Sequence, residues 1–228
     1  MELGQSAGKS YAYLLGVYLG DGCVTRYNKG IAFRVNTIDE DFALAIKAAL
    51  KDVTETTVRI WKETVSKSSK PNYALCCADE VLAKRFVAET HDKQILPRME
   101  SLENKKAIIV GLMDSEGFVA KNTNNHTGRA YYMGYKSCDV WVPELISLMQ
   151  SVGLRMGKIS ECPPYKHHYK IPTRFTIKMQ SWVDSGMRFN IKRKQDRVDT
   201  WAATEPYTQR RVNPRKLTSE TTRQTSAS

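Results

Sequence analysis

The chain has 228 residues and carries 35 lysines and arginines against 24 aspartates and glutamates, a formal net charge of +11. This length can hold one large domain or two small ones, and it can bury a core without disulfide bonds. The charge favours a polyanionic partner, because Lys and Arg bound to phosphates release condensed counterions, although an ordinary basic protein is nearly as consistent with it.

The cysteines and the apolar runs exclude several classes of protein. The five cysteines form no CxxC pair and are odd in number, so neither a zinc site nor a disulfide framework is predicted, and we expect reduced thiols. No apolar run approaches the ~18 residues of a membrane span, and residues 1–10 lack the apolar core of a signal peptide. We therefore expect an intracellular protein without membrane contact, either cytoplasmic in a prokaryote or phage host or organellar.

The first half is predicted to contain a helix, a hairpin, a second helix, a second hairpin and a third helix. Its opening stretch is small and apolar on several sides, as in a helix buried between partners. Alternating side chains around polar turns indicate the hairpins, and Asp39 could cap the second helix. The predicted elements are helix 11–20, strands 23–27 and 31–37, helix 39–51, strands 56–65 and 73–78, and helix 81–89.

The second half repeats this order of elements. They are helix 104–115, strands 117–121 and 129–135, helix 142–152, strands 154–160 and 174–179, and a basic, largely helical stretch 182–201. Two copies indicate a duplicated unit and not a solenoid. The predicted organisation is an N-terminal segment 1–10, a first repeat 11–95, a linker 96–103, a second repeat 104–204 and a basic tail 205–228, expected to be disordered.

The helices that open the two repeats share a nonapeptide pattern. LLGVYLGDG in the first matches IVGLMDSEG in the second, and both end in a small residue, an acid and a glycine. Gly16 and Gly20 in the first copy are four residues apart and so share a helix face, as do Gly111 and Ser115 in the second. Small residues on one face let two helix backbones approach closely. The pattern predicts that these two helices pack side by side.

Such packing would bring the terminal acids, Asp21 and Glu116, to one end of the helix pair. Two carboxylates in that position repel each other unless a cation joins them. Carboxylate oxygens and waters are the ligands that Mg²⁺ prefers. A divalent cation held there can activate water and stabilise the leaving oxygen in phosphodiester cleavage. The sequence therefore predicts a shared metal site.

The nonapeptides resemble those of LAGLIDADG homing endonucleases, specifically the single-chain members with two motifs, and the element order matches the family's αββαββα unit over residues 11–201. The resemblance implies an α+β fold of two pseudo-symmetric αββαββα repeats, each with a twisted antiparallel DNA-binding sheet, packed through the motif helices. It makes Asp21 and Glu116 the catalytic acids and places Mg²⁺, or another divalent cation such as Mn²⁺, on these acids with Gly20 and Ser115. The first motif departs from the consensus at Leu19, where the family has an acid.

The resemblance also implies one basic residue near the active site in each half. In the first half Lys93, which precedes a hydrophobic-proline pair, matches the family's lysine, although a solvated linker lysine is the alternative. In the second half the stretch Ile191-Lys192-Arg193-Lys194 occupies the corresponding place. We assign the role to Lys192 and keep Lys194 as the alternative. Such lysines orient water or stabilise developing charge.

The two sheets are expected to form a saddle on double-stranded DNA, with alternate residues facing the major groove. Arg and Asn can bond G and A edges bidentately, whereas Lys more often contacts phosphate. A solvated sheet face is the alternative for any single residue. The predicted contacts are Arg26, Tyr27, Lys29, Arg34, Asn36, Arg59, Trp61, Lys62, Arg129, Tyr131, Tyr135, Lys158, Ser160, Lys166, His167, His168, Arg174 and Lys178. Thr37 and Ser137 could orient active-site water.

The predicted function is that of a monomeric, site-specific homing endonuclease that makes a metal-dependent double-strand break in a long asymmetric DNA site and acts in intron homing. Because the halves differ in sequence, one chain can address two different half-sites. Two alternatives share the fold: an intron maturase that binds RNA, and a non-catalytic DNA-binding regulator. Retention of both motif acids favours the endonuclease.

Overall fold

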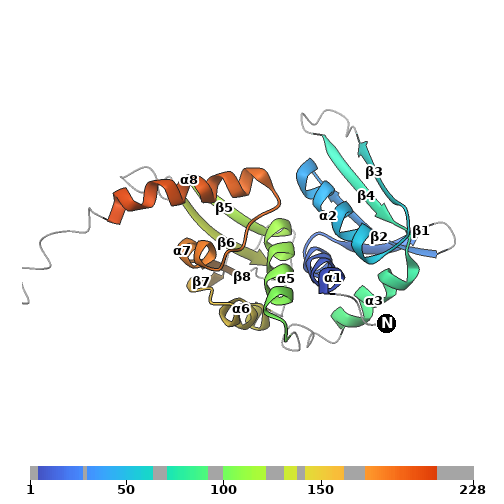
Figure 1. The fold of residues 1–228 in the computed structure, drawn as a ribbon, viewed down its shortest axis with the longest axis horizontal. Helices are drawn as coiled ribbons and strands as arrows, with labels where there is room; N and C mark the ends of the chain where they lie inside the picture. Colours follow the sequence, from blue (N-terminus) through green and yellow to red (C-terminus); the bar gives the residue numbers. More distant parts are fainter. Residues whose placement is uncertain are drawn as a thin grey trace, which may run out of the picture.

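The computed structural model describes residues 5–27, 30–63, 71–91, 100–121, 131–137, 142–161 and 173–209. Figure 1 shows two units on either side of a central pair of helices, α1 (Gln5–Leu19) and α5 (Leu102–Ser115). Each of these helices opens one repeat. The expected α+β fold with two related repeats is confirmed. None of the helices in the described part of the chain is both long and apolar enough to cross a bilayer.

The first repeat is a four-stranded antiparallel sheet with two further helices. Its strands have the order β1-β2-β4-β3. They are β1 (Cys23–Tyr27), β2 (Gly30–Thr37), β3 (Val58–Glu63) and β4 (Asn72–Cys77), and the helices are α2 (Glu40–Val53) and α3 (Glu80–His91). Helix α2 buries Phe42, Ile46, Ala49 and Leu50, which recur at helical spacing and cover one sheet face.

The second repeat has the corresponding order, β5-β6-β8-β7. Its strands are β5 (Gly117–Lys121), β6 (Tyr131–Ser137), β7 (Met156–Glu161) and β8 (Thr173–Ile177), and its helices after α5 are α6 (Val142–Ser151), α7 (Met179–Asp184) and α8 (Lys192–Gln209). The stretch predicted as largely helical thus divides into two helices. Gly186 has φ 73°, a left-handed conformation that stops α7 and redirects the chain before α8.

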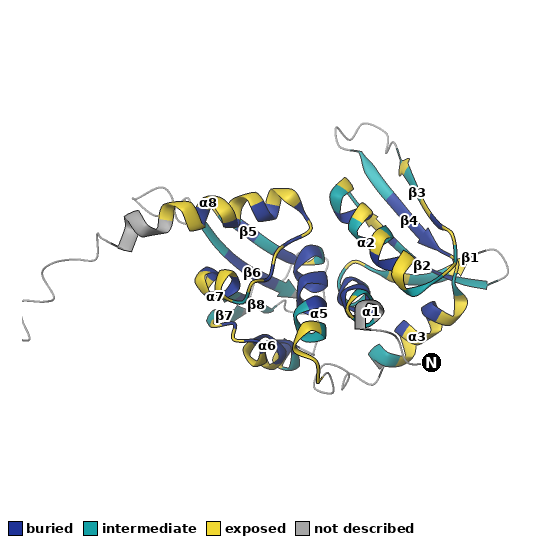
Figure 2. Cartoon of the chain, in the orientation of Figure 1, coloured by how far each residue is buried: buried dark blue, intermediate teal, exposed yellow. Residues whose placement is uncertain are grey.

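Helices α1 and α5 touch through their backbones. A Cβ added to Gly16 would overlap the carbonyl oxygen of Ile108, and one added to Gly111 would overlap the carbonyl oxygen of Tyr13. Figure 2 shows α5 largely buried, whereas α2 and α8 alternate between buried and exposed positions. The close approach predicted from the small residues is therefore present, and it sets where the two helices end.

Candidate active site and nucleic-acid interface

The C-terminal ends of α1 and α5 meet at Gly20 and Ser115. A Cβ on Gly20 would overlap the Ser115 Cβ and would lie 2.9 Å from the Ser115 Oγ and 3.4 Å from the Glu116 Cγ. Glu116 is the C-cap residue of α5, with its N–H donating to the Leu112 carbonyl at 2.9 Å. Asp21 directly follows Gly20. The two acids therefore extend from adjoining helix ends, 95 positions apart in sequence (116 − 21).

A cleft of about 260 Å³ opens at this junction between the repeats. Asp21 lies in its wall, and burial by the surrounding groups raises the pKa of its carboxyl. The neighbouring Asp39 raises this pKa further, while the Lys194 ammonium lowers it. The lining residues are Asp21, Asn36, Thr37, Ile38, Asp39, Phe42, Asn72, Asp114, Ser115 and Arg193. A carboxylate in such surroundings is stabilised by a bound cation.

The donor groups at the junction fit a hard divalent cation. The residues that end the two helices, Gly20-Asp21 and Ser115-Glu116, carry carboxylate and backbone carbonyl oxygens as possible ligands. In the part of the chain that the structure describes, no group of three or more His, Cys, Asp and Glu side chains lies in an arrangement that could hold a metal ion. A cation at Asp21 and Glu116 would therefore have two side-chain carboxylates, and Mg²⁺ can bind proteins through one or two carboxylates while it keeps several waters.

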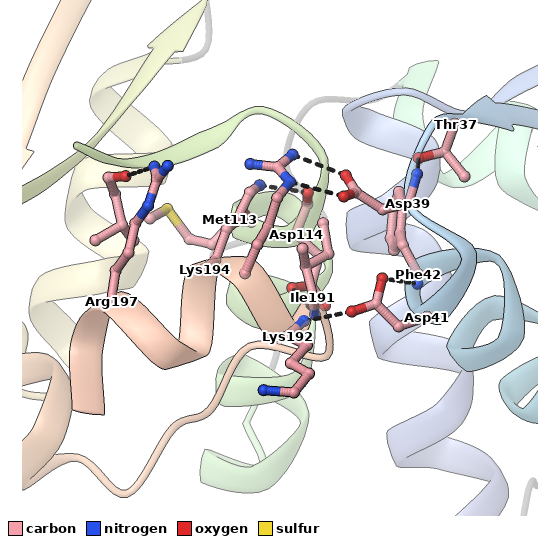
Figure 3. A network of polar contacts seen from close by, with 12 residues as sticks. Thr37, Asp39, Asp41, Phe42, Met113, Asp114, Ile191, Lys192, Lys194 and Arg197 are labelled. Atoms are coloured by element: carbon pink, nitrogen blue, oxygen red, sulfur yellow. Dashed lines mark hydrogen bonds and ion pairs between the residues drawn. The ribbon is translucent and has the colours of Figure 1, made fainter. Parts of the chain in front are cut away.

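Lys194 lies at the end of α5, and Lys192 does not (Figure 3). The Lys194 side chain is 3% exposed, and its Nζ donates to the carbonyl oxygens of Met113 at 2.8 Å and Asp114 at 2.6 Å. Burial lowers its pKa to about 8, against an opposing effect from Asp114. The exposed Lys192 ammonium instead pairs with Asp196 at 2.7 Å. Of the two lysines weighed for the second half, the geometry favours Lys194.

The start of α8 is tied to the first repeat beside the cleft. Arg193 donates from Nε and from a terminal nitrogen to the two oxygens of Asp39, each at 2.7 Å, and the Lys192 backbone N–H donates to Asp41. Figure 3 shows Asp39 and Asp41 on the first repeat facing this segment. Asp39 stands at the N-cap position of α2 as predicted, but its side chain makes no capping hydrogen bond because it binds Arg193.

The first sheet has an outer face, defined here as the face opposite its core residues Phe33, Val35 and Leu75. Strand register places Arg34 beside Cys76 and Arg59, and Asn36 beside Ala74 and Trp61. The Arg34 guanidinium lies over the Trp61 ring, 5.7 Å from its centroid. Four predicted DNA contacts therefore share this outer face: Arg34, Asn36, Arg59 and Trp61.

Two further predicted contacts lie on the opposite side of the first sheet. Arg26 pairs with Ile31, and Lys62 pairs with Tyr73, so both follow the phase of the core residues. Their side chains are exposed at the sheet edges. The sequence pattern predicts them on the same face as Arg34, and the strand register corrects this expectation.

The outer face of the second sheet carries an arginine on aromatic rings. The Arg174 guanidinium lies 4.7 Å from the Phe118 ring centroid and 5.3 Å from that of Tyr132, and it donates to the Tyr132 hydroxyl at 2.9 Å. Register places Lys136 and Ser160 beside Arg174. Phe118, Tyr132 and Lys136 were not predicted as contacts. Cys23 and Phe118 stand at the same position, two residues after the motif acid, and Cys23 pairs with Arg34 of the first outer face. This correspondence could have placed Phe118, and the strand residues in phase with it, on the outer face of the second sheet.

Tyr131 and Tyr135 lie on the core-facing side of β6, opposite Tyr132 and Lys136. Tyr135 is fully buried and stacks on Phe175, with ring centroids 5.5 Å apart, so its predicted contact with DNA is wrong for this fold. Tyr131 follows the same core-facing phase at the end of the strand. Lys158 and Lys178 are exposed, the first beside an irregularity of β7 and the second at the N-cap of α7.

Several predicted residues lie outside the described part of the chain. They are Lys29, Lys93, Arg129, Lys166, His167 and His168. Tyr27 and Ser137 end strands β1 and β6, and only their backbone positions are described. Thr37 lines the cleft, and its hydroxyl accepts a hydrogen bond from the Asp39 N–H at 3.1 Å.

Residues 9–90 match the model of the LAGLIDADG-like domain. The first repeat is thus similar to the LAGLIDADG-like domain. The whole chain has the fold of two-motif LAGLIDADG proteins, as the nonapeptides predicted. Among curated protein sequences none matches the chain.

Solved structures show the same fold at low sequence identity. Mesophilic variants of the homing endonuclease I-DmoI match with a TM-score of 0.55 at 15% identity, over 79% of this chain and 92% of theirs. The homing endonuclease I-WcaI bound to its DNA recognition sequence matches with a TM-score of 0.57 at 11% identity, over 86% and 88%. The N-terminal LAGLIDADG domain of DUF199/WhiA matches with a TM-score of 0.54 at 10% identity, over 81% and 82%. The likeness establishes the fold.

Proposed function

We propose that this protein is a site-specific homing endonuclease that makes a metal-dependent double-strand break in a long, asymmetric DNA site. The observation that supports it most is that the two helix ends that carry Asp21 and Glu116 meet, on helices in backbone contact. A core helix pair needs no acid at that position. The buried ammonium of Lys194 at the same helix end adds the third group that phosphodiester cleavage uses.

Asp21 and Glu116, with the carbonyl oxygens of Gly20 and Ser115, would hold Mg²⁺ or Mn²⁺. Bound there, a divalent cation supplies an activated water and stabilises charge on the leaving oxygen. The Lys194 ammonium has three N–H donors, and the carbonyls of Met113 and Asp114 take two of them. Its positive charge also interacts with the Asp21 carboxylate, so it would help to stabilise negative charge that develops beside the acids.

The outer faces of the two sheets would hold the DNA, one on each half-site. Arg34 and Arg174 are both held against aromatic rings, which limits the conformational entropy lost when a guanidinium binds a guanine edge. Since the two faces carry different residues, a single chain is sufficient for an asymmetric target. The fold similarity to I-WcaI, which is described as bound to its recognition sequence, supports this partner.

A DNA-binding regulator is the second candidate, because WhiA shares the fold. The two proposals differ in what Asp21 and Glu116 do. In the regulator these acids would be end residues of packed helices, and DNA binding would complete the function. In the endonuclease their replacement removes cleavage and leaves DNA binding intact.

The experiment first selects a tightly bound duplex from randomised DNA and then measures its cleavage with Mg²⁺, Mn²⁺ or EDTA. Asp21→Asn and Glu116→Gln are expected to bind this DNA as the wild type does and to cut it at least ~100-fold more slowly, the scale of losing a group that stabilises developing charge. Glu55→Gln, an exposed acid beyond α2, is the matched control and should cut normally. Tight binding without cleavage in either metal would support the regulator instead.

A further inference from the structure

Asp114 is a buried carboxylate that holds the segment leading into α8. It is 1% exposed, and its Oδ1 accepts the Asn190 N–H at 3.1 Å while its Oδ2 accepts the Asn190 side-chain amide at 2.9 Å. The Ile191 N–H lies 3.5 Å from Oδ1, and the Tyr13 hydroxyl donates to Oδ2 at 3.2 Å. Burying a carboxylate is costly unless hydrogen bonds compensate, and here three come from one short segment.

That segment leads directly to Lys194. The Lys194 backbone N–H donates to the Ile191 carbonyl at 3.0 Å, so Ile191 begins the first turn of α8. The Lys194 side chain then returns to α5, where its Nζ donates to the backbone carbonyl of Asp114 itself. Asp114 thus holds Lys194 in two ways: its carboxylate binds the backbone before Lys194, and its backbone carbonyl accepts a hydrogen bond from the Lys194 ammonium (Figure 3).

The first repeat has no carboxylate at the matching position. In the two nonapeptides Asp114 corresponds to Leu19, which packs against the hydrophobic core. The motif helix of the first repeat therefore offers no carboxylate at this position that could hold a neighbouring segment. The two motif helices thus differ at this position, although both carry an acid before the final glycine.

We propose that Asp114 is a positioning residue that sets Lys194 at one of two cleavage centres, so that cutting of one DNA strand depends on Asp114 and cutting of the other does not. This inference rests on the proposed endonuclease function. Asp114 touches neither DNA nor metal in this account. It acts through the Asn190–Ile191 backbone, which places the start of α8 relative to α5.

A strand-resolved cleavage assay tests the inference. The selected duplex is labelled with a different fluorophore on each strand, and the rate of each cut is measured with Mg²⁺. Asp114→Asn and Asp114→Leu, the second of which copies Leu19, should slow one strand about tenfold more than the other and accumulate nicked DNA. Lys194→Met should slow the same strand. DNA affinity should stay within about twofold of the wild type.

Two milder variants keep the test decisive if the Asp114 variants do not fold. Asn190→Ala and Tyr13→Phe each remove a single hydrogen bond to Asp114, the first from the segment before α8 and the second from α1. Asn190→Ala should bias cleavage towards one strand, and Tyr13→Phe should leave the strand ratio unchanged. Equal slowing of both strands by Asn190→Ala, or a bias on the strand that Lys194→Met spares, would overturn the inference. The proposed function itself fails in a distinguishable way, with no cut by the wild type on either strand.

Discussion

Replacing Gly16 by Ala should destabilise the protein strongly, because α1 and α5 touch at this glycine without any intervening side chain. The new Cβ would overlap the Ile108 carbonyl oxygen and would lie 3.0 Å from the Leu112 nitrogen. Both obstacles are backbone atoms, so no rotamer change can relieve them and the helices must separate. Overpacking a core costs about 1–3 kcal/mol, and this rigid contact should reach the upper end. For a chain of this length about 3 kcal/mol corresponds to a fall in Tm of roughly 6–12 °C.

Gly8→Ala, in the same helix, is the matched control. A Cβ at Gly8 would have the Asn104 side chain as its nearest neighbour, at 3.8 Å, which is ordinary contact. Because Ala favours a helix interior over Gly by up to about 1 kcal/mol, this variant should melt at or above the wild-type temperature. Thermal unfolding followed by circular dichroism compares the three proteins. Equal melting temperatures for Gly16→Ala and Gly8→Ala would refute the close-contact argument.

Three further predictions concern charged residues. Arg174→Lys should lose the guanidinium stack and relax base preference at one position of one half-site, with about a tenfold loss of affinity, measured by profiling randomised DNA; loss at many positions would contradict a local contact. Arg193→Ala leaves Asp39 unpaired and should lower the free energy of unfolding by about 1 kcal/mol, since the Arg193 side chain is 50% exposed. It should also change the Mg²⁺ concentration needed for cleavage. An unchanged melting temperature and an unchanged metal titration would argue against a role for the Arg193–Asp39 ion pair. The pKa of Lys194 is lowered from 10.5 to about 8 in the folded state, so between these pH values the unfolded chain binds more protons than the folded protein. The free energy of unfolding in urea, taken as the wild-type value minus the Lys194→Met value, should therefore rise by up to about 3 kcal/mol as the pH increases through that window. A difference that does not change with pH would contradict a buried ammonium.

The sequence was sufficient to predict the repeat and the helix pair because both depend on local pattern. Small residues four apart are visible in the nonapeptides, and Gly16 and Gly111 lie in backbone contact as expected. Strand and helix positions followed from alternation and apolar spacing. Predicting these features does not require knowing which elements of the fold pack together.

Side-chain direction was harder to predict where the local pattern was ambiguous. In β6 aromatic residues occupy both phases, as Tyr131, Tyr132 and Tyr135, so alternation could not decide which face was buried; contact with Phe175 decides it. In α8 the two lysines are two positions apart. Which of them turns towards α5 depends on the break at Gly186 and on the bonds of Asp114, neither of which is local to the lysines.

The most direct test of the account is cleavage of a supercoiled plasmid that carries the selected binding site, in the presence of Mg²⁺. The proposed metal site at Asp21 and Glu116 predicts a linear product from the wild-type protein, and intact, protein-bound plasmid when either acid is replaced. Tight binding of the wild type with no nicked or linear product, in Mg²⁺ and in Mn²⁺, would contradict it.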